Sequence, residues 1–288
     1  MPTPKIDLHL HSTASDGRLD PADVVRLAAE RDVALVALTD HDTLRGVPAA
    51  QAAGRELGVG VLAGIEISGR YNGGQCHLLA WLPDPAPADF IDWTHRKERE
   101  RDERAREMVE RLRALGHPIS WEELRASVKG NIGRPHIADA LVKAGSVATP
   151  AEAFERLIGN DCPAYVPSGK IAPTEAVAIA AGAGALVALA HPQTLKLDDG
   201  GLDDFVAQLA EAGLGAVEAH RGDQSTEQST AYRAVAQRLG LLVSPGSDFH
   251  RLGEDTRWLG RCGDPGIAPD DLEALLSRLP GARDALGR

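Results

Sequence analysis

Strand-like and helix-like segments alternate along most of this chain. Short aliphatic runs such as Val33–Leu38 are followed by amphipathic helical patterns such as Val47–Leu57. This alternation is typical of βαβ units, in which helices cover a sheet of parallel strands. The expected strands are 5–11, 33–38, 59–65, 76–82, 185–189, 215–219 and 241–244, and the expected helices are 21–31, 47–57, 202–212, 225–239 and 270–278. The sequence therefore predicts a parallel α/β architecture.

The alternation stops between about Pro83 and Pro167. A proline cluster opens this stretch and marks a break between elements. Helical patterns follow, and the first of them, Phe90–Leu115, is long and heavily charged. Its opposite charges four residues apart can pair along a solvated helix face; the pairs are Glu100/Arg104, Asp102/Arg106 and Glu107/Arg111. We predict an α/β domain made of residues 1–83 and 167–288, into which residues 84–166 are inserted as an all-helical subdomain that could form a lid.

Composition narrows the possible functions. The net charge of −11 over 288 residues makes non-specific binding to duplex DNA unexpected, because such binding needs a broad basic face. The longest apolar stretch, Ala176–Ala190, is too short and too weak to span a bilayer, and the first residues lack the apolar core of a signal peptide. The three widely spaced cysteines are typical of reduced thiols. We therefore expect a cytoplasmic protein; the sequence makes no prediction of its oligomeric state.

Histidines and acids follow the expected strands at the points where the strands end. In a (β/α) barrel these carboxyl ends meet on one face, which is where active sites lie. One such histidine alone is more often a hydrogen-bonded structural residue, but a whole set at successive strand ends indicates a shared site. The set comprises His9, His11, Asp16, His41, Glu66, His77, His191, Asp248 and His250.

The spacing within this set favours metal ions. His9 and His11 are two residues apart, so a strand places both imidazoles on the same side, where a shared metal explains them best. Glu66 stands between two isoleucines, where an unpaired carboxylate is costly, and its two oxygens could bridge two ions. For Asp16 and Asp42, roles as a turn former and a helix cap remain alternatives.

The donor types narrow the choice of metal. Imidazoles and carboxylates without matched cysteines suit Mn²⁺, Fe²⁺ or Zn²⁺ and disfavour a structural zinc site of the cysteine type. The set also contains more donors than one ion needs, so two or three divalent ions are expected. Clustered ions of this kind lower the pKa of bound water and clamp phosphoryl oxygens.

At this point the sequence resembles the PHP (polymerase and histidinol phosphatase) family. The motifs that carry the resemblance are His9-Leu-His11-Ser12, Asp16-Gly17, Thr39-Asp40-His41-Asp42, Gly64-Ile65-Glu66, Ala190-His191-Pro192 and Gly246-Ser247-Asp248-Phe249-His250. The resemblance implies a distorted (β/α)₇ barrel with up to three metal ions. It assigns His9, His11, Glu66 and Asp248 to a first ion, Glu66, His77 and His191 to a second, and Asp16, His41 and His250 to a third.

Within this family, the chain is most similar to a stand-alone branch that carries a helical insertion. That branch includes nucleoside 3′,5′-bisphosphate phosphatases and the 5′→3′ exonuclease RNase AM. The similarity implies that Arg134, His136 and Lys170 contact substrate phosphate, and the planar fork of Arg134 suits that role. A surface salt bridge remains the alternative for Arg134. Glu218 and His220 are expected to be structural, although Glu218 could orient a ligand.

The expected reaction is hydrolysis of a phosphomonoester by attack of a metal-bridging hydroxide. The leaving group could take its proton from a metal-bound water, His191 or Asp40. The resemblance implies a small phosphorylated nucleotide such as adenosine 3′,5′-bisphosphate (pAp), or short 5′-phosphorylated RNA, as substrate. Three rivals stay open: a histidinol phosphate phosphatase, a binding module without turnover, and a metal-dependent amidohydrolase. The last is disfavoured because Glu66 stands where a carbamylated lysine would bridge the ions.

Overall fold

Seven strands form one continuous sheet in the order β1 to β7. The computed structural model describes residues 4–71, 74–167, 171–253, 255–260 and 266–287. The strands are β1 (Lys5–Leu10), β2 (Val33–Leu38), β3 (Gly60–Tyr71), β4 (Gly74–Trp81), β5 (Leu186–Leu189), β6 (Ala216–His220) and β7 (Leu242–Pro245). The predicted α/β fold class is confirmed, and every predicted strand is present; β2 has the predicted bounds, and the ends of the others are shifted.

The sheet is parallel except at β4, which runs antiparallel to both β3 and β5. The prediction of an all-parallel arrangement is therefore wrong at this strand. Only Asn72 and Gly73 separate β3 from β4, a connection too short for the crossover that a parallel pair requires. The sheet closes into a barrel because the residues after β7 pair with β1. The His11 N–H donates to the Phe249 carbonyl, and the Asp248 N–H donates to the His9 carbonyl, each at 2.9 Å.

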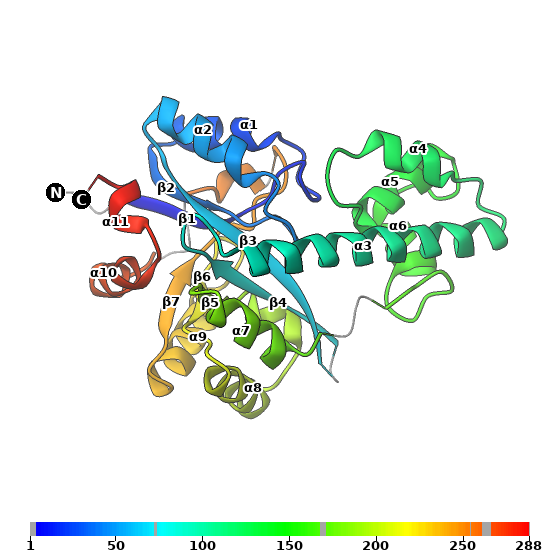
Figure 1. Cartoon of the computed structure of the whole chain (residues 1–288). Coiled ribbons are helices and arrows are strands. Elements are labelled where there is room, and N and C mark those ends of the chain that lie inside the picture. Colours follow the sequence, from blue (N-terminus) through cyan, green and yellow to red (C-terminus); the bar gives the residue numbers. More distant parts are fainter. Residues whose placement is uncertain (1–3, 72–73, 168–170, 254, 261–265, 288) are drawn as a thin grey trace.

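Helices cover the outside of the sheet and one of its ends (Figure 1). On one side lie α1 (Pro21–Ala29) and α2 (Val47–Leu57), and on the other α7 (Pro173–Gly182), α8 (Asp199–Glu211) and α9 (Thr226–Arg238). The end near both termini is covered by α10 (Pro269–Arg278) and α11 (Ala282–Ala285). Short 3₁₀ turns occur at Pro192–Leu195 and Asp255–Arg257. Within the described residues, no helix combines the length and apolar character needed to cross a bilayer.

Large aliphatic side chains fill the barrel interior. Leu8, Leu35, Leu79 and Trp81 are fully buried there, and leucines of α10 close the end of this core. The Trp81 indole N–H donates to the Leu8 carbonyl at 3.0 Å, so its polar atom is satisfied inside the apolar core. Alternate residues of each strand face inward or outward, and the outward ones pack beneath the surrounding helices.

A separate group of helices projects from the sheet, and we call it the helical lobe (residues 88–158). It consists of α3 (Ala88–Ala114), α4 (Trp121–Ser127), α5 (Arg134–Lys143), α6 (Pro150–Ala153) and a π-helical turn at Phe154–Ile158. The far half of α3 joins a hydrophobic core of its own with α4 and α5. The near half packs Phe90 and Trp93 against the core of the sheet. A single long helix therefore joins the two parts, as Figure 1 shows.

The charged surface of α3 differs from the prediction of a solvated face. Of the three predicted i,i+4 pairs, Glu107/Arg111 forms, at 2.6 Å. Arg104 instead donates to the Val166 carbonyl at 2.7 Å, and Asp102 pairs with Arg125 at 3.1 Å. Helix periodicity alone does not show which charged face meets another part of the chain, and here one face turns toward the sheet.

We predict that Leu8→Ala weakens the barrel core. The Leu8 side chain is fully buried, so its truncation should lower the free energy of unfolding by about 2–5 kcal/mol. Leu57→Ala is the matched control, because Leu57 is 41% exposed and its truncation should cost less than about 0.5 kcal/mol. Urea unfolding followed by circular dichroism measures both. Equal effects of the two substitutions would contradict this picture of the core.

Candidate metal centre

The predicted set of histidines and acids meets at one end of the barrel. His9 lies near the end of β1, and His11 follows the strand directly, on the same side. Asp16 lies in the loop that comes next. His41 follows β2, and Glu66 lies within β3, where an isolated bridge joins the backbones of these two residues. The remaining members are His77 in β4, His191 after β5, and Asp248 and His250 after β7. Barrel closure next to Phe249 therefore brings the last segment against the first.

Three overlapping groups of these side chains offer ligand atoms within 4.8 Å of one another. We name each group after one member. The His9 group contains His9, His11, Glu66 and Asp248; the His77 group contains His41, Glu66 and His77; the Asp16 group contains His11, Asp16, His41 and His250. The structure thus brings all of these predicted residues together.

Glu66 lies at the centre of the cluster and is 1% exposed. Its Oε1 is 2.8 Å from His77 Nδ1 and 2.9 Å from His191 Nε2. Its Oε2 is 3.0 Å from His11 Nε2 and 3.2 Å from His41 Nδ1. His9 Nε2 is also 3.3 Å from Oε2. Each oxygen thus faces a different set of imidazoles, which is the arrangement needed for a carboxylate that bridges two ions.

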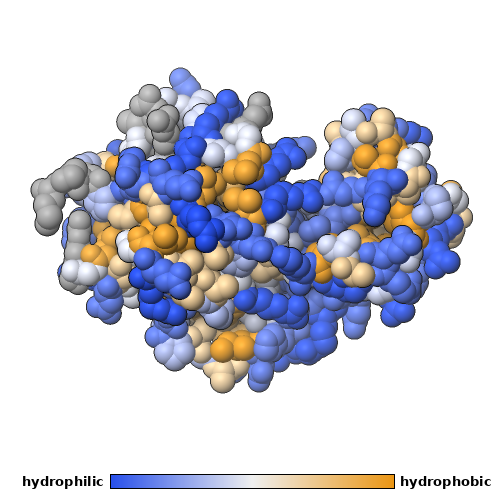
Figure 2. Space-filling model, turned by 90° about the horizontal axis from the view of Figure 1, so that it is seen from above, coloured by the Kyte–Doolittle hydropathy of each residue, from blue (hydrophilic) through white to orange (hydrophobic). Residues whose placement is uncertain are grey.

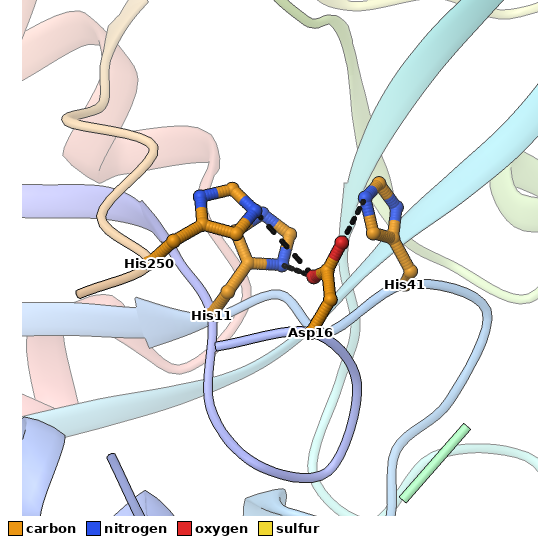
Figure 3. A group of neighbouring side chains, drawn as sticks. All are labelled: His11, Asp16, His41 and His250. Carbon is orange, nitrogen blue, oxygen red and sulfur yellow. Dashed lines mark ion pairs between the residues drawn. The ribbon is translucent and has the colours of Figure 1, made fainter. Parts of the chain in front are cut away.

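The Asp16 group is shown in Figure 3. The Asp16 carboxylate points between the rings, with one oxygen toward His11 and His250 and the other toward His41. The closest of these contacts is 3.4 Å, to His250 Nε2, and the others are 3.8 Å. The rings of His11 and His250 stack with their centroids 4.2 Å apart. These separations exceed good hydrogen-bond distances and leave room between the donor atoms.

The electrostatics of the cluster are those of closely packed opposite charges. Burial raises the pKa of the Glu66 carboxyl, but the surrounding imidazoles outweigh burial and hold it well below its usual range. Burial lowers the pKa of His11, yet Asp248 and Glu66 raise it to about 10. Burial dominates at His41 and lowers its pKa to about 3 despite Glu66 and Asp16. A neutral His41 and ionised carboxylates are the protonation states that bind a divalent ion, whereas His11 must release a proton when an ion binds.

Several buried donor atoms support the fit of metal ions to these residues. His11 Nδ1, His41 Nδ1 and Glu66 Oε2 are buried, and within the described residues none of them makes a hydrogen bond. Buried polar atoms normally have partners, and those without one need an explanation such as a bound ion. The imidazole and carboxylate donors, together with their convergence, fit divalent ions.

The backbone near the cluster adopts conformations that side chains other than glycine rarely take. Asp248 has φ 55°, His191 has φ 29° and Asp42 has φ 53°. Such left-handed residues concentrate at functional sites, where the surrounding structure holds them. Gly246 is required for space, because a Cβ there would lie 2.3 Å from Glu218 Oε1 and 2.5 Å from His9 Cβ.

A second layer of charged residues supports the cluster, and Glu218 is its main member. Glu218 Oε1 accepts from His9 Nδ1 at 2.8 Å, and its Oε2 accepts the His191 backbone N–H at 2.7 Å. Glu218 therefore orients two members of the set, which is the role that the sequence left as an alternative. Arg221 donates to Asp248 Oδ2 at 3.1 Å and to both carboxylate oxygens of Asp223. The sequence analysis missed Arg221, which no motif marks.

A cavity of about 170 Å³ adjoins the cluster on the side of the helical lobe. It is lined by four cations and three carboxylates, and two of these carboxylates, Glu100 and Asp42, pair with Lys97 and Arg101. Asp16, His41 and His77 line it from the barrel. The cations that line it are Lys97, Arg101, Arg104 and Arg134. The first three follow at i, i+4 and i+7 on α3, a spacing that could have revealed a common face in the sequence.

Two of these arginines carry charge without a carboxylate partner among the described residues. Arg134 bonds only to the side-chain oxygens of Asn160 and Gln75 and lies over the rings of Phe154 and Tyr165. Burial, with the neighbouring positive charges of Arg134 and Arg101, lowers the pKa of Arg104 to about 10. Repulsion among cations of this kind favours binding of an anion.

A larger cavity of about 570 Å³ also borders the cluster and shares His41, Gln75 and His77 with the first. Its polar lining includes Tyr71, Gln75, Gln193, Arg221 and Asp223, along with several members of the metal cluster. This volume falls within the range of about 300–1,000 Å³ found for small-molecule sites. Figure 2 shows that the face seen from above is mostly hydrophilic and is hollowed between the two parts of the molecule.

The other predicted site residues have different positions. His191 lines the larger cavity. Asp40 lines neither cavity, because its buried carboxylate accepts from the Ser12 N–H and the hydroxyls of Ser12 and Ser15. His136 lies on the other side of α5 in a separate groove, and its Nδ1 accepts the Gly133 N–H at 3.0 Å. Lys170 lies outside the described residues.

His220, which the sequence analysis expected to be structural, is buried at the end of β6. Its ring lines neither of the two cavities beside the cluster. Burial lowers its pKa, although the nearby carboxylate of Asp271 opposes this effect.

Comparison with known proteins agrees with this geometry. Residues 7–160 match the PHP domain family. The chain belongs to that family. It is 33% identical over 261 residues to a 3′,5′-nucleoside bisphosphate phosphatase of Chromobacterium violaceum, covering 90% of this chain and 92% of that protein. It is also 33% identical over 248 residues to the 5′-3′ exoribonuclease Rnm of Salmonella typhimurium, covering 85% of each chain.

Among solved structures, the chain resembles a protein from Bifidobacterium adolescentis assigned as a metal-dependent phosphoesterase. The two share 33% sequence identity with a TM-score of 0.80, over 96% of this chain and 97% of that one. The predicted family membership is therefore confirmed, and the chain is a metal-dependent phosphoesterase of the PHP type, with a barrel that its relatives share.

We predict that Glu218→Gln weakens metal binding although Glu218 is not itself a ligand. A glutamine side chain has one accepting oxygen and one NH₂ group, which donates. Either His9 Nδ1 or the His191 backbone N–H would therefore face this NH₂ group and lose its acceptor. Loss of such an outer partner typically weakens metal affinity about 10- to 100-fold. Competitive chelator titration with Mn²⁺ measures the change. Glu227→Gln, at an exposed site on α9, is the control and should bind Mn²⁺ as the wild type does.

Proposed function

We propose that this protein is a phosphatase for nucleoside 3′,5′-bisphosphates such as pAp. The observation that carries the proposal is the cationic cavity directly beside the metal cluster. A substrate with two phosphates could place one at the cluster and the other against Arg104 and Arg134, which have positive charge and no carboxylate partner among the described residues. A substrate with one phosphate would leave this second group of cations unused.

In this proposal the three groups around Glu66 hold two or three divalent ions, with Mn²⁺ as the first choice and Fe²⁺ or Zn²⁺ as alternatives. His191 completes the set beside Glu66, where its Nε2 lies 2.9 Å from Oε1. Bound ions would neutralise phosphoryl oxygens and lower the pKa of water at the cluster. The orphaned buried atoms of His11, His41 and Glu66 support this assignment.

The side chains of the chain itself bind and orient the substrate in this proposal. The guanidinium of Arg134 lies over the rings of Phe154 and Tyr165, and its planar fork can offer two parallel N–H bonds to a phosphate. Arg101 is fixed by Asp42 and Ser68, at 2.5 and 2.7 Å, and extends the positive wall toward the cluster. Of the two predicted side-chain proton donors, Asp40 lines neither cavity, and His191 is used as a ligand through Nε2 while its Nδ1 faces Thr194. We therefore assign protonation of the leaving group to water at the cluster.

The names of the relatives support a nucleotide substrate of this kind. One is named a nucleoside bisphosphate phosphatase and the other a 5′-3′ exoribonuclease. Each such substrate carries phosphates on both sides of a ribose. We therefore include short 5′-phosphorylated oligoribonucleotides among the proposed substrates, with the larger cavity of about 570 Å³ as the place for the nucleoside.

The rival functions make different use of the site. Histidinol phosphate has one phosphate and a positively charged amine, which the arginines would repel. An amidohydrolase with a carbamylated lysine has no counterpart here, because Glu66 occupies the central position between the imidazoles. A binding module would hold the metal ions without hydrolysing a substrate, and the phosphate-release assay below distinguishes it from an enzyme.

The test is phosphate release in Mn²⁺ from pAp, 5′-AMP, histidinol phosphate and a short 5′-phosphorylated RNA. We expect the highest kcat/KM with pAp or the RNA. Release from histidinol phosphate alone would replace the proposed substrate but keep the metal centre. A metal-loaded protein that releases phosphate from none of the four would overturn the proposed function.

We predict that Arg134→Ala raises the KM for pAp about 10- to 100-fold, because a hydrogen bond to a charged group contributes roughly 1.5–3 kcal/mol. The KM for 5′-AMP should change less than about threefold, since that substrate lacks the second phosphate. Arg106→Ala is the matched control, because the Arg106 side chain on α3 is 60% exposed and pairs weakly with Glu110 at 3.8 Å. Steady-state kinetics with both substrates measures the split. An equal rise in KM for pAp and 5′-AMP would show that Arg134 does not bind the second phosphate.

A further inference from the structure

The segment between α4 and α5 of the helical lobe contacts the barrel loop that carries Asp16. Asn131 is at the centre of this contact and is 2% exposed. Its backbone N–H donates to the Ala14 carbonyl, and its side-chain Nδ2 donates to the His41 carbonyl, both at 3.0 Å. One residue of the lobe thus bonds to two backbone positions next to members of the Asp16 group.

The backbones meet very closely beside Asn131. A Cβ added to Gly130 would lie 2.0 Å from the Ala14 carbonyl oxygen, so only glycine allows the approach. Two ion pairs flank the contact: Lys129 binds Asp20 at 2.9 Å, and Arg18 pairs with Asp139 of α5. Both flanking pairs are substantially exposed and contribute little individually, so the buried Asn131 is the specific part of the contact.

The loop also bonds to the third side of the group. The Arg18 N–H donates to the His250 carbonyl at 2.7 Å, two residues after Asp16. Asn131 fixes the same loop through Ala14 and fixes His41 through its carbonyl. The backbones around Asp16, His41 and His250 are therefore held relative to one another by a short chain of bonds in which Asn131 is the link supplied by the lobe.

We propose that Asn131 is a positioning residue for the ion of the Asp16 group, so that the helical lobe completes this part of the metal centre and does not merely cover it. The inference rests on the proposed function, because it takes the Asp16 group as a metal site. Ligand geometry depends on such outer contacts, and their loss usually weakens binding more than tenfold. The His9 group has no direct bond to this segment within the described residues.

The same segment continues into the phosphate-binding part of the lobe. Arg134 follows Asn131 by three residues and lines the cationic cavity. A phosphate that holds Arg134 therefore also holds the segment that positions His41 and the Asp16 loop. Because linkage is reciprocal, occupancy of the Asp16 group and binding of the second phosphate strengthen each other.

The test is Mn²⁺ stoichiometry and affinity of the full chain, measured by elemental analysis after gel filtration and by electron paramagnetic resonance titration of free Mn²⁺. We expect three ions for the wild type, and for Asn131→Ala one ion fewer, or one bound at least tenfold more weakly. Gly130→Ala pushes the same segment from Ala14 while keeping the Asn131 side chain, and should lose the same ion. Lys129→Ala is the control and should keep all three.

Circular dichroism and thermal unfolding establish that each variant is folded. If Asn131→Ala does not fold, Gly130→Ala decides the question. A folded variant of either kind with wild-type Mn²⁺ number and affinity would overturn the inference. A wild type that hydrolyses pAp with two ions only would also overturn it while leaving the proposed function standing. A wild type that binds no Mn²⁺ would instead overturn the proposed function.

Discussion

The structure depends on one buried carboxylate, Glu66, being surrounded by imidazoles from several strands. An ionised carboxylate in a barrel core is costly unless opposite charge surrounds it, and the charge must come from β1, β2, β4 and β5 at once. Barrel closure makes this possible, since it brings residues far apart in the sequence to one end of the sheet. The same closure forces Asp248 against His9, at 3.2 Å. Formation of the barrel therefore also assembles the candidate metal centre.

Holding so many donors together has structural costs around the cluster. Asp248 and His191 take left-handed backbone conformations, and Gly246 must lack a side chain. Glu218 offsets part of this cost by accepting one bond from the His9 ring and one from the His191 backbone. Its own burial is tolerated because His9 and Arg221 lie beside it and lower its pKa against the effect of burial. Glu218 thus orients the His9 ring and the His191 backbone within the cluster.

Sequence patterns predicted the parts of this structure that depend on local periodicity and on convergence of strand ends. The strands and the histidines that follow them could be found because parallel strands end at one edge. The antiparallel direction of β4 was not predicted, since an apolar run has the same pattern in a parallel and in an antiparallel strand. Asp40 was expected near the reaction, but only the fold shows Ser12 and Ser15 occupying its oxygens. The charged run of α3 was taken as a solvated face because the docking of this helix is a tertiary property.

Local charge, and not the net charge of the chain, decides what this site attracts. The protein carries −11 overall, yet the cavity next to the cluster holds Arg104 and Arg134, which have no carboxylate partner among the described residues. Fields in a cleft are focused by nearby charges, while distant surface acids are screened over about 8 Å at physiological salt. An acidic surface repels long polyanions that lack a matching contact, whereas the unpaired arginines of the cavity can attract a short anion. The distribution of charge therefore agrees with the small phosphorylated substrates that we propose.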